Sequence, residues 1–162
     1  MIVFHVESYR GAREENYLLV KKQLAALLDG EPNRIANLSN ASALLNQFLD
    51  RINWVGFYLL EDDELVLGPF QGLPACVRIP LGRGVCGTAA RQMKTIRVED
   101  VHKFPGHIAC DAASQSEIVI PLIKDGSLIG VLDIDSPEKN RFDQLDEKEL
   151  EDFANILISS LS

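Results

Sequence analysis

Hydrophobic residues recur with a helical period at both ends of the chain. Near the N-terminus, a helix is predicted that ends near Gly30. One side of it carries Leu18, Lys21, Leu24, Ala25 and Leu28. A second helix is predicted after Glu31-Pro32-Asn33, with an apolar stripe of Ile35, Leu38, Ala41, Leu45, Phe48 and Leu49. A last helix is predicted to start near Asp146, where Glu149 completes a capping box, and to bury Leu150, Phe153, Ala154 and Leu157.

The middle of the chain has the short apolar runs and turns of β-strands. Strands are predicted at residues 54–60, 65–67, 75–79, 95–98, 117–123 and 128–135. The acidic turn 61–64 and the turn 124–127 make two hairpins of them. Gly82-Arg83-Gly84 opens a short helix that runs through Met93, and residues 99–116 form a long loop, a feature that is often functional. We see neither repeats nor linkers, so this pattern predicts one α+β domain over residues 1–162.

Successive side chains alternate between the two faces of each predicted strand. One face is apolar and suits the helices: Val55, Phe57 and Leu59, then Ile118, Ile120 and Leu122, then Leu132 and Ile134. The other face carries Trp54, Tyr58, Glu117, Asp133 and Asp135. Aromatic and acidic residues together on one face, beside a long loop, indicate a covered pocket.

Plainer interpretations of these residues stay open at this point. Trp54 is more often a core residue than part of a ligand site. Asp133 and Asp135 could flank a turn or protect an edge strand from unwanted pairing. Glu117 by itself carries no information; the agreement of all these residues on one face is what favours a site.

Composition and charge exclude several partners. The net charge is −8, with 24 acidic against 16 basic residues and no basic cluster, so nucleic acid and anionic membranes are not expected. Met1 to Val6 is too short for the apolar core of a signal peptide, and no apolar run is long enough to span a bilayer. We therefore expect a cytoplasmic protein.

The cysteines are three in number, widely spaced and odd in count: Cys76, Cys86 and Cys110. A secreted disulfide scaffold would have more of them in an even count. In a reducing compartment they are core residues, metal ligands or reactive thiols. A structural zinc site of the three cysteines and His107 is one interpretation, but spacings of ten and 24 residues lack the paired Cys-x-x-Cys units of common zinc sites.

Four blocks of sequence carry a family resemblance. They run from Asn53 to Tyr58, from Gln71 through Cys76 to Gly87, from Phe104 through Cys110 to Ile118, and from Ile129 to Ser136. Together they resemble the free methionine-(R)-sulfoxide reductases, which have the GAF fold. The last block alone is weak, because many GAF domains have a similar segment; the cysteines in their own motifs make the match specific.

The resemblance implies a fold and a function. The fold would be an antiparallel sheet of about six strands, with the N- and C-terminal helices on one face and a closed ligand pocket on the other. The activity would be thiol-dependent reduction of free L-methionine (R)-sulfoxide, with a role in oxidative stress, thioredoxin as reductant, and neither metal nor organic cofactor. The runner-up is a non-catalytic GAF module that senses a small ligand; a homodimer stays open.

The resemblance also implies roles for individual residues. Trp54, Tyr58, Glu117, Asp133 and Asp135 would bind the substrate, the aromatic rings packing on its methyl group and sulfur. Glu117 and Asp135 would grip and protonate the sulfoxide oxygen, because crowded, desolvated acids hold a proton better, and Asp133 would bind the ammonium group.

The sequence alone does not decide which cysteine attacks the substrate. Cys110 lies in the long loop, whereas Cys86 follows a glycine-rich turn near a helix start, a position that can lower a thiol pKa. The resemblance favours Cys110 as the nucleophile, which becomes a sulfenic acid, and Cys76 as the thiol that resolves it to a disulfide. Cys86 would be auxiliary or a second resolving thiol.

Overall fold

A computed structural model of the chain describes residues 9–108 and 110–161. The helices are α1 (Arg13–Leu28), α2 (Arg34–Phe48), α3 (Gly84–Gln92) and α4 (Gln144–Ser159), with a 3₁₀ turn at Val101–Lys103. The strands are β1 (Trp54–Glu61), β2 (Glu64–Gly72), β3 (Arg78–Pro80), β4 (Ile96–Val98), β5 (Ser116–Lys124) and β6 (Ser127–Ser136). The expectation for Met1 to Val6 falls outside the described residues.

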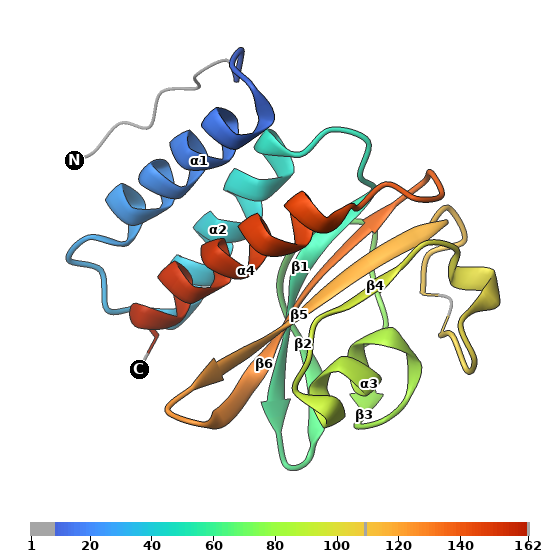
Figure 1. Cartoon of the computed structure of the whole chain (residues 1–162). Helices are drawn as coiled ribbons and strands as arrows, with labels where there is room; N and C mark the ends of the chain where they lie inside the picture. The colour runs from blue at the N-terminus through green and yellow to red at the C-terminus, as the bar shows by residue number, and fades with distance from the viewer. Residues whose placement is uncertain (1–8, 109, 162) are drawn as a thin grey trace.

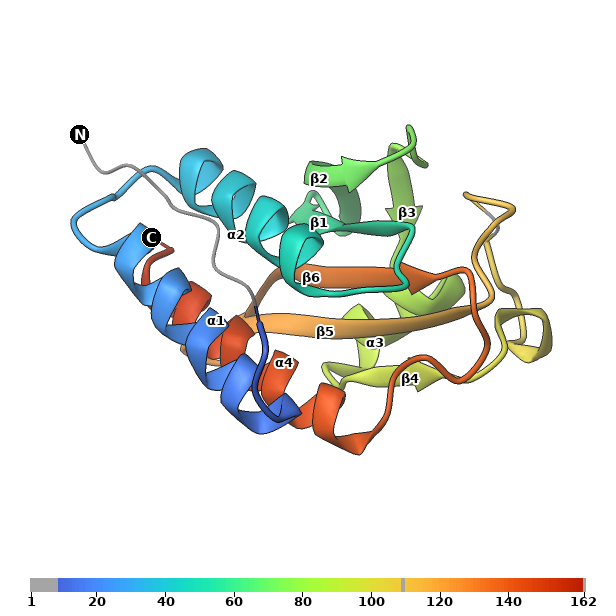
Figure 2. The same ribbon diagram turned by 90° about the horizontal axis from the view of Figure 1, so that it is seen from above.

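All strands join one antiparallel sheet of six, in the order β3-β2-β1-β6-β5-β4. The hairpins β1–β2 and β5–β6 lie at its centre, and β1 pairs with β6 between them. Helices α1, α2 and α4 form a layer over one face, while α3 lies on the other (Figures 1 and 2). The predicted α+β architecture is confirmed.

The helical layer covers the apolar face of the sheet. Strand residues Val55, Phe57, Ile118, Leu132 and Ile134 are fully buried there. They pack against helix residues that include Leu24, Leu38, Leu45, Leu150, Phe153 and Leu157. At about 1.5–3 kcal/mol for each large apolar side chain removed from water, this packing fixes the sheet to the helices and leaves the opposite face for the pocket.

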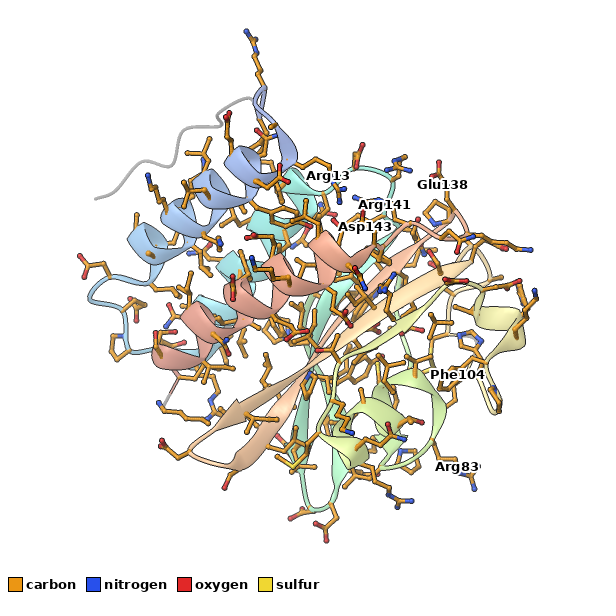
Figure 3. All side chains as sticks on the ribbon, in the orientation of Figure 1. Arg13, Arg83, Phe104, Glu138, Arg141 and Asp143 are labelled. Atoms are coloured by element: carbon orange, nitrogen blue, oxygen red, sulfur yellow. A yellow bond between two sulfur atoms is a disulfide. The ribbon has the colours of Figure 1, made fainter. Side chains whose placement is uncertain are left out.

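Charged side chains tie the first helix to the start of the last helix. The Arg13 guanidinium contacts Asp143 at 2.7 Å and Asp146 at 3.0 Å, and Arg141 reaches Asp146 at 3.4 Å (Figure 3). The Tyr17 hydroxyl donates to Asp146 at 2.6 Å. This network joins α1 to the start of α4, on the side of the sheet away from the pocket.

The predicted start of the last helix was wrong. Helix α4 begins at Gln144, and Asp143 with Asp146 forms the capping box, each side chain accepting from the backbone N–H of the other residue. Glu149 instead accepts a hydrogen bond from the Lys21 ammonium group at 2.6 Å. Both acid pairs have the spacing of three residues that a capping box requires, so spacing alone did not distinguish them.

The buried faces of the first two helices also differ in part from the prediction. Helix α1 buries Tyr17, Val20, Leu24 and Leu28, whereas Leu18 is 51% exposed. In α2 the stripe holds, except that Ile35 in the first turn is 68% exposed because it precedes the part of the helix that contacts the sheet.

Predicted and observed strand boundaries differ most in the segment that carries Cys76. Strand β2 continues to Gly72, beyond the predicted residues 65–67, and the expected strand 75–79 is an irregular connection that joins β3 only at Arg78. The predicted loop 99–116 contains the short 3₁₀ turn. Within the described residues, no helix is both long and apolar enough to cross a membrane.

Candidate active site

The polar face of the sheet gathers one row of functional side chains across three strands. Trp54 on β1 is the cross-strand partner of Asp135 on β6, which is in turn the partner of Glu117 on β5. The next row on the same face places Gly56 opposite Asp133. The alternation of side chains along each strand therefore brings together the residues that the sequence placed on one face.

Aromatic rings form one wall of this site. Trp54 stacks on Tyr58, with ring centroids 5.9 Å apart, and on Phe70 at 5.2 Å. Gly56 makes room for this arrangement, because a Cβ there would meet the Cβ of Phe70 at 2.2 Å. The polar groups of Trp54 and Tyr58 are both hydrogen-bonded. Trp54 Nε1 donates to the Leu73 carbonyl at 3.1 Å, and the Tyr58 hydroxyl donates to the Cys76 carbonyl at 2.9 Å.

Carboxyl groups lie beside these rings on the same face of the sheet. Glu117 and Asp133 are buried and Asp135 is half-buried. Burial raises the pKa of Glu117 well above its usual value, and the nearby Asp133 and Asp135 raise it further. Burial likewise raises the pKa of Asp135, with Asp133 adding to the effect, and it raises the pKa of Asp133 as well. Raised pKa values favour the protonated form of these carboxyls, which is the form that can donate a proton.

One oxygen of this cluster is ready for a ligand. Oδ1 of Asp133 is buried and, within the described residues, has no hydrogen-bond partner. A buried carboxylate oxygen without a donor is costly, so a cationic or N–H group of a ligand would be favoured there. Cys86, Glu117 and Asp133 also bring one donor atom each to within 4.8 Å of one another, a set that could hold a metal ion.

Cys76 and Cys110 are joined in a disulfide at the mouth of the pocket. Their Cα atoms lie 5.6 Å apart, although the residues are separated by 34 positions. Cys76 comes from the connection between β2 and β3, and Cys110 from the connection between β4 and β5; both extend beyond the same end of the sheet (Figure 2). A zinc site that uses both thiols is therefore wrong for this structure, because the disulfide occupies them.

Cys86 lies inside the pocket as a free, buried thiol. It is in the first turn of α3, and its Sγ lies 3.9 Å from Oε2 of Glu117. A helix start can lower a thiol pKa, but here burial raises the pKa of Cys86, and the acids Asp133, Glu117 and Asp135 raise it further. Cys86 is thus a neutral thiol that can donate to a carboxylate.

His107 approaches the acids from the loop. Its Nε2 lies 3.8 Å from Oε1 of Glu117. Burial, with a smaller contribution from His102, lowers the pKa of His107, so the imidazole is neutral at pH 7 and the contact is not an ion pair. A neutral imidazole adds no positive charge beside the carboxyl cluster.

Asn53, Asp111 and Ser114 are site-supporting residues that the sequence did not identify beyond their place in the motifs. The Asn53 amide donates to Asp111 at 2.9 Å and to Ser114 at 3.1 Å. Sequence separations of 58 and 61 residues gave no local signal for these contacts.

The pocket beside these side chains is small. Its cavity measures about 40 Å³ and is lined by Trp54, Tyr58, the three acids, Cys86, Cys110, His107 and the start of α3. That volume holds a few water molecules.

Comparisons with known proteins agree with this geometry. The GAF domain family model matches residues 38–159. The chain is 61% identical to protein YtsP of Bacillus subtilis, covering 99% of both chains. It is 59% identical to the free methionine-R-sulfoxide reductase of Escherichia coli, covering 85% of this chain and 84% of that one. The fRMsr of Staphylococcus aureus in complex with substrate has a TM-score of 0.88 and 56% identity, over 96% of this chain and 100% of that one. The chain thus belongs to the free methionine-R-sulfoxide reductase family of GAF-domain proteins.

Proposed function

We propose that this protein reduces free methionine (R)-sulfoxide to methionine with its own thiols. The observation that carries the proposal is a disulfide between Cys76 and Cys110 at the mouth of a pocket that contains clustered, buried acids. The relatives named as free methionine-R-sulfoxide reductases support it.

The pocket walls match the parts of the substrate. The unpartnered Oδ1 of Asp133 suits the ammonium group, whose three N–H donors would satisfy it. The stacked rings of Trp54 and Tyr58 suit the methyl group and the partly positive sulfur. Binding the free ammonium group in a buried site favours the free amino acid over a peptide.

Glu117 and Asp135 supply the acid that the reaction needs. A sulfoxide oxygen leaves sulfur only when it is protonated, and the raised carboxyl pKa values favour the protonated acid that can supply this proton. Cys86, neutral and 3.9 Å from Glu117, is an auxiliary donor to that carboxyl.

Cys110 is the attacking thiol in this mechanism. Its thiolate bonds to the substrate sulfur, the protonated oxygen is transferred to the cysteine, and methionine leaves a sulfenic acid on Cys110. The Cys76 thiol then displaces water from the sulfenic acid and forms the disulfide. Two electrons have passed from two thiols to the sulfoxide.

A dithiol reductant completes the cycle. The disulfide leaves no free thiol on Cys76 or Cys110, so it must be reduced before the next turnover. We propose thioredoxin in the cytoplasm as that reductant, because its potential of about −270 mV suits such an exchange.

A coupled assay tests the function. Purified protein with thioredoxin, its reductase and NADPH should release methionine from free methionine (R)-sulfoxide, and a variant with Cys76, Cys86 and Cys110 all changed to Ser should release none. Tight binding of the sulfoxide without turnover would favour a sensory module instead.

A further inference from the structure

Asn53 joins the first strand to the loop that carries Cys110. It directly precedes β1, and its backbone N–H donates to the Asp135 carbonyl at 2.9 Å, so the backbone of Asn53 is fixed to the edge of the acid cluster. Its side-chain amide donates outward, to Asp111 Oδ2 at 2.9 Å and to Ser114 Oγ at 3.1 Å. One residue therefore contacts both the sheet and the loop.

The loop segment that Asn53 holds is internally ordered. Asp111 Oδ1 accepts the Ala113 N–H at 2.8 Å, and the Ser114 N–H donates to the Asp111 carbonyl at 3.2 Å. Residues 111–114 thus form one compact turn, which begins directly after Cys110. Fixing this turn fixes the position of Cys110 relative to the pocket.

The Asn53 amide also has an unfavourable feature. Oδ1 of Asn53 is buried and has no hydrogen-bond partner in the described part of the chain. An unpaired buried acceptor destabilises a fold, so its retention is explained by what the N–H₂ donors on the same amide hold.

We propose that Asn53 is a positioning residue, whose amide holds the turn at residues 111–114 so that the Cys110 sulfur faces both the pocket and Cys76. The inference rests on the proposed function in one respect, the assignment of Cys110 and Cys76 as the working thiols. Without the amide contact, the sulfenic acid on Cys110 should have a longer lifetime before Cys76 converts it to the disulfide.

The test separates loop position from substrate chemistry. Reduced protein is treated with hydrogen peroxide, which converts the Cys110 thiol to a sulfenic acid and water; the Cys76 thiol then displaces a second water to form the disulfide. The rate of disulfide closure is measured by quenching samples over time and mapping their peptides. A sulfenic-acid trap measures how much Cys110 sulfenic acid is present at each time.

Asn53→Asp places a carboxylate against Asp111 and should slow closure about tenfold, with more Cys110 captured by the trap. The double variant Asn53→Asp/Asp111→Asn restores an amide–carboxylate pair in the reverse direction and should return closure to within about twofold of wild type. Should Asn53→Asp fail to fold, Asn53→Ala makes the same comparison, with a smaller expected delay.

Asn37→Ala is the matched control. Asn37 is also a buried amide that joins two segments, donating to the Glu31 carbonyl at 2.9 Å, but it lies on α2, in the helical layer. This variant should lose stability while closing its disulfide at the wild-type rate.

Unchanged closure in both Asn53 variants would overturn the inference, as would a delay that the double variant does not rescue. The proposed function fails separately, if wild type closes its disulfide with peroxide but releases no methionine from free methionine (R)-sulfoxide. In that case a rescued delay in Asn53→Asp would still establish the positioning contact.

Discussion

Glu117 and Asp135 are direct cross-strand partners on β5 and β6, two acids that face each other in the pocket. Like charges directly opposite one another destabilise a sheet, and burial adds the cost of removing each charge from water. The pKa values of both acids are raised, which favours their neutral forms and reduces this cost. The same raised pKa values make the stability of the fold sensitive to pH.

Replacing the acids by their amides should abolish most catalysis without unfolding the protein. We expect Glu117→Gln, Asp135→Asn and Asp133→Asn each to lower kcat/KM by roughly 10²–10⁴-fold, because each loses a proton donor or a charged contact. Steady-state assays at low and saturating substrate measure the loss. Asp152→Asn, which changes an acid on α4, is the control and should keep wild-type rates; wild-type rates in the other three would leave those acids without a role in the reaction.

Stability should fall as pH rises, and the acid pair should account for part of the fall. Because the pKa of each carboxyl is higher in the folded than in the unfolded chain, their contribution is complete below the ordinary values of 4.5 for Glu117 and 3.8 for Asp135. It is lost as pH rises through the folded values. Glu117→Gln removes this loss, so its Tm should exceed that of wild type by about 2–4 °C at pH 8 and match it at pH 4. Parallel Tm profiles of the two proteins between pH 4 and 8 would contradict the raised pKa.

The enzyme should act on the free amino acid alone. N-acetylation removes the ammonium group that Asp133 would bind and leaves a buried carboxylate oxygen unpaired, which costs about 10²-fold or more in kcat/KM. Methionine release from free, N-acetylated and peptide-bound sulfoxide can be compared directly. Similar rates on all three would mean that the pocket is not selective for the ammonium group.

The two disulfide cysteines should divide the reaction between them. Cys110→Ser should release no methionine even in a single turnover. Cys76→Ser should release about one methionine per chain and then stall, with a sulfenic acid on Cys110 that a trap can label. One methionine per chain from Cys110→Ser would reassign the attack to Cys86.

Cys86 should be the least reactive thiol of the reduced protein. Its raised pKa and buried position keep the thiolate rare, so alkylation at pH 8 should label it at least about tenfold more slowly than Cys76 or Cys110. Mass spectrometry of partially labelled protein gives the order. In urea all three should react alike, which separates the effect of the fold from that of neighbouring sequence; preferential labelling of Cys86 in the folded protein would contradict its assignment as a neutral thiol.

Much of the site followed from the sequence, because a strand has a fixed period of two. Once residues near 54, 117 and 133 were recognised as strands, the face shared by Trp54, Glu117 and Asp133 was determined without knowing how the strands pair. The helical period likewise identified the buried faces of α2 and α4 in most positions, since a core-facing stripe needs only local spacing.

Tertiary structure decided the contacts and energies that depend on distant residues. Spacing did not choose between Asp143 and Asp146 as the start of α4, and local helix geometry did not decide the direction of the Cys86 pKa shift. Only the fold brings Glu117 within 3.9 Å of that thiol and bridges Cys76 to Cys110 across 34 residues. The contact from Asn53 to Asp111 likewise exists only because β1 begins beside the loop. Periodicity is encoded locally, whereas burial, charge proximity and long-range pairing arise when the chain closes on itself.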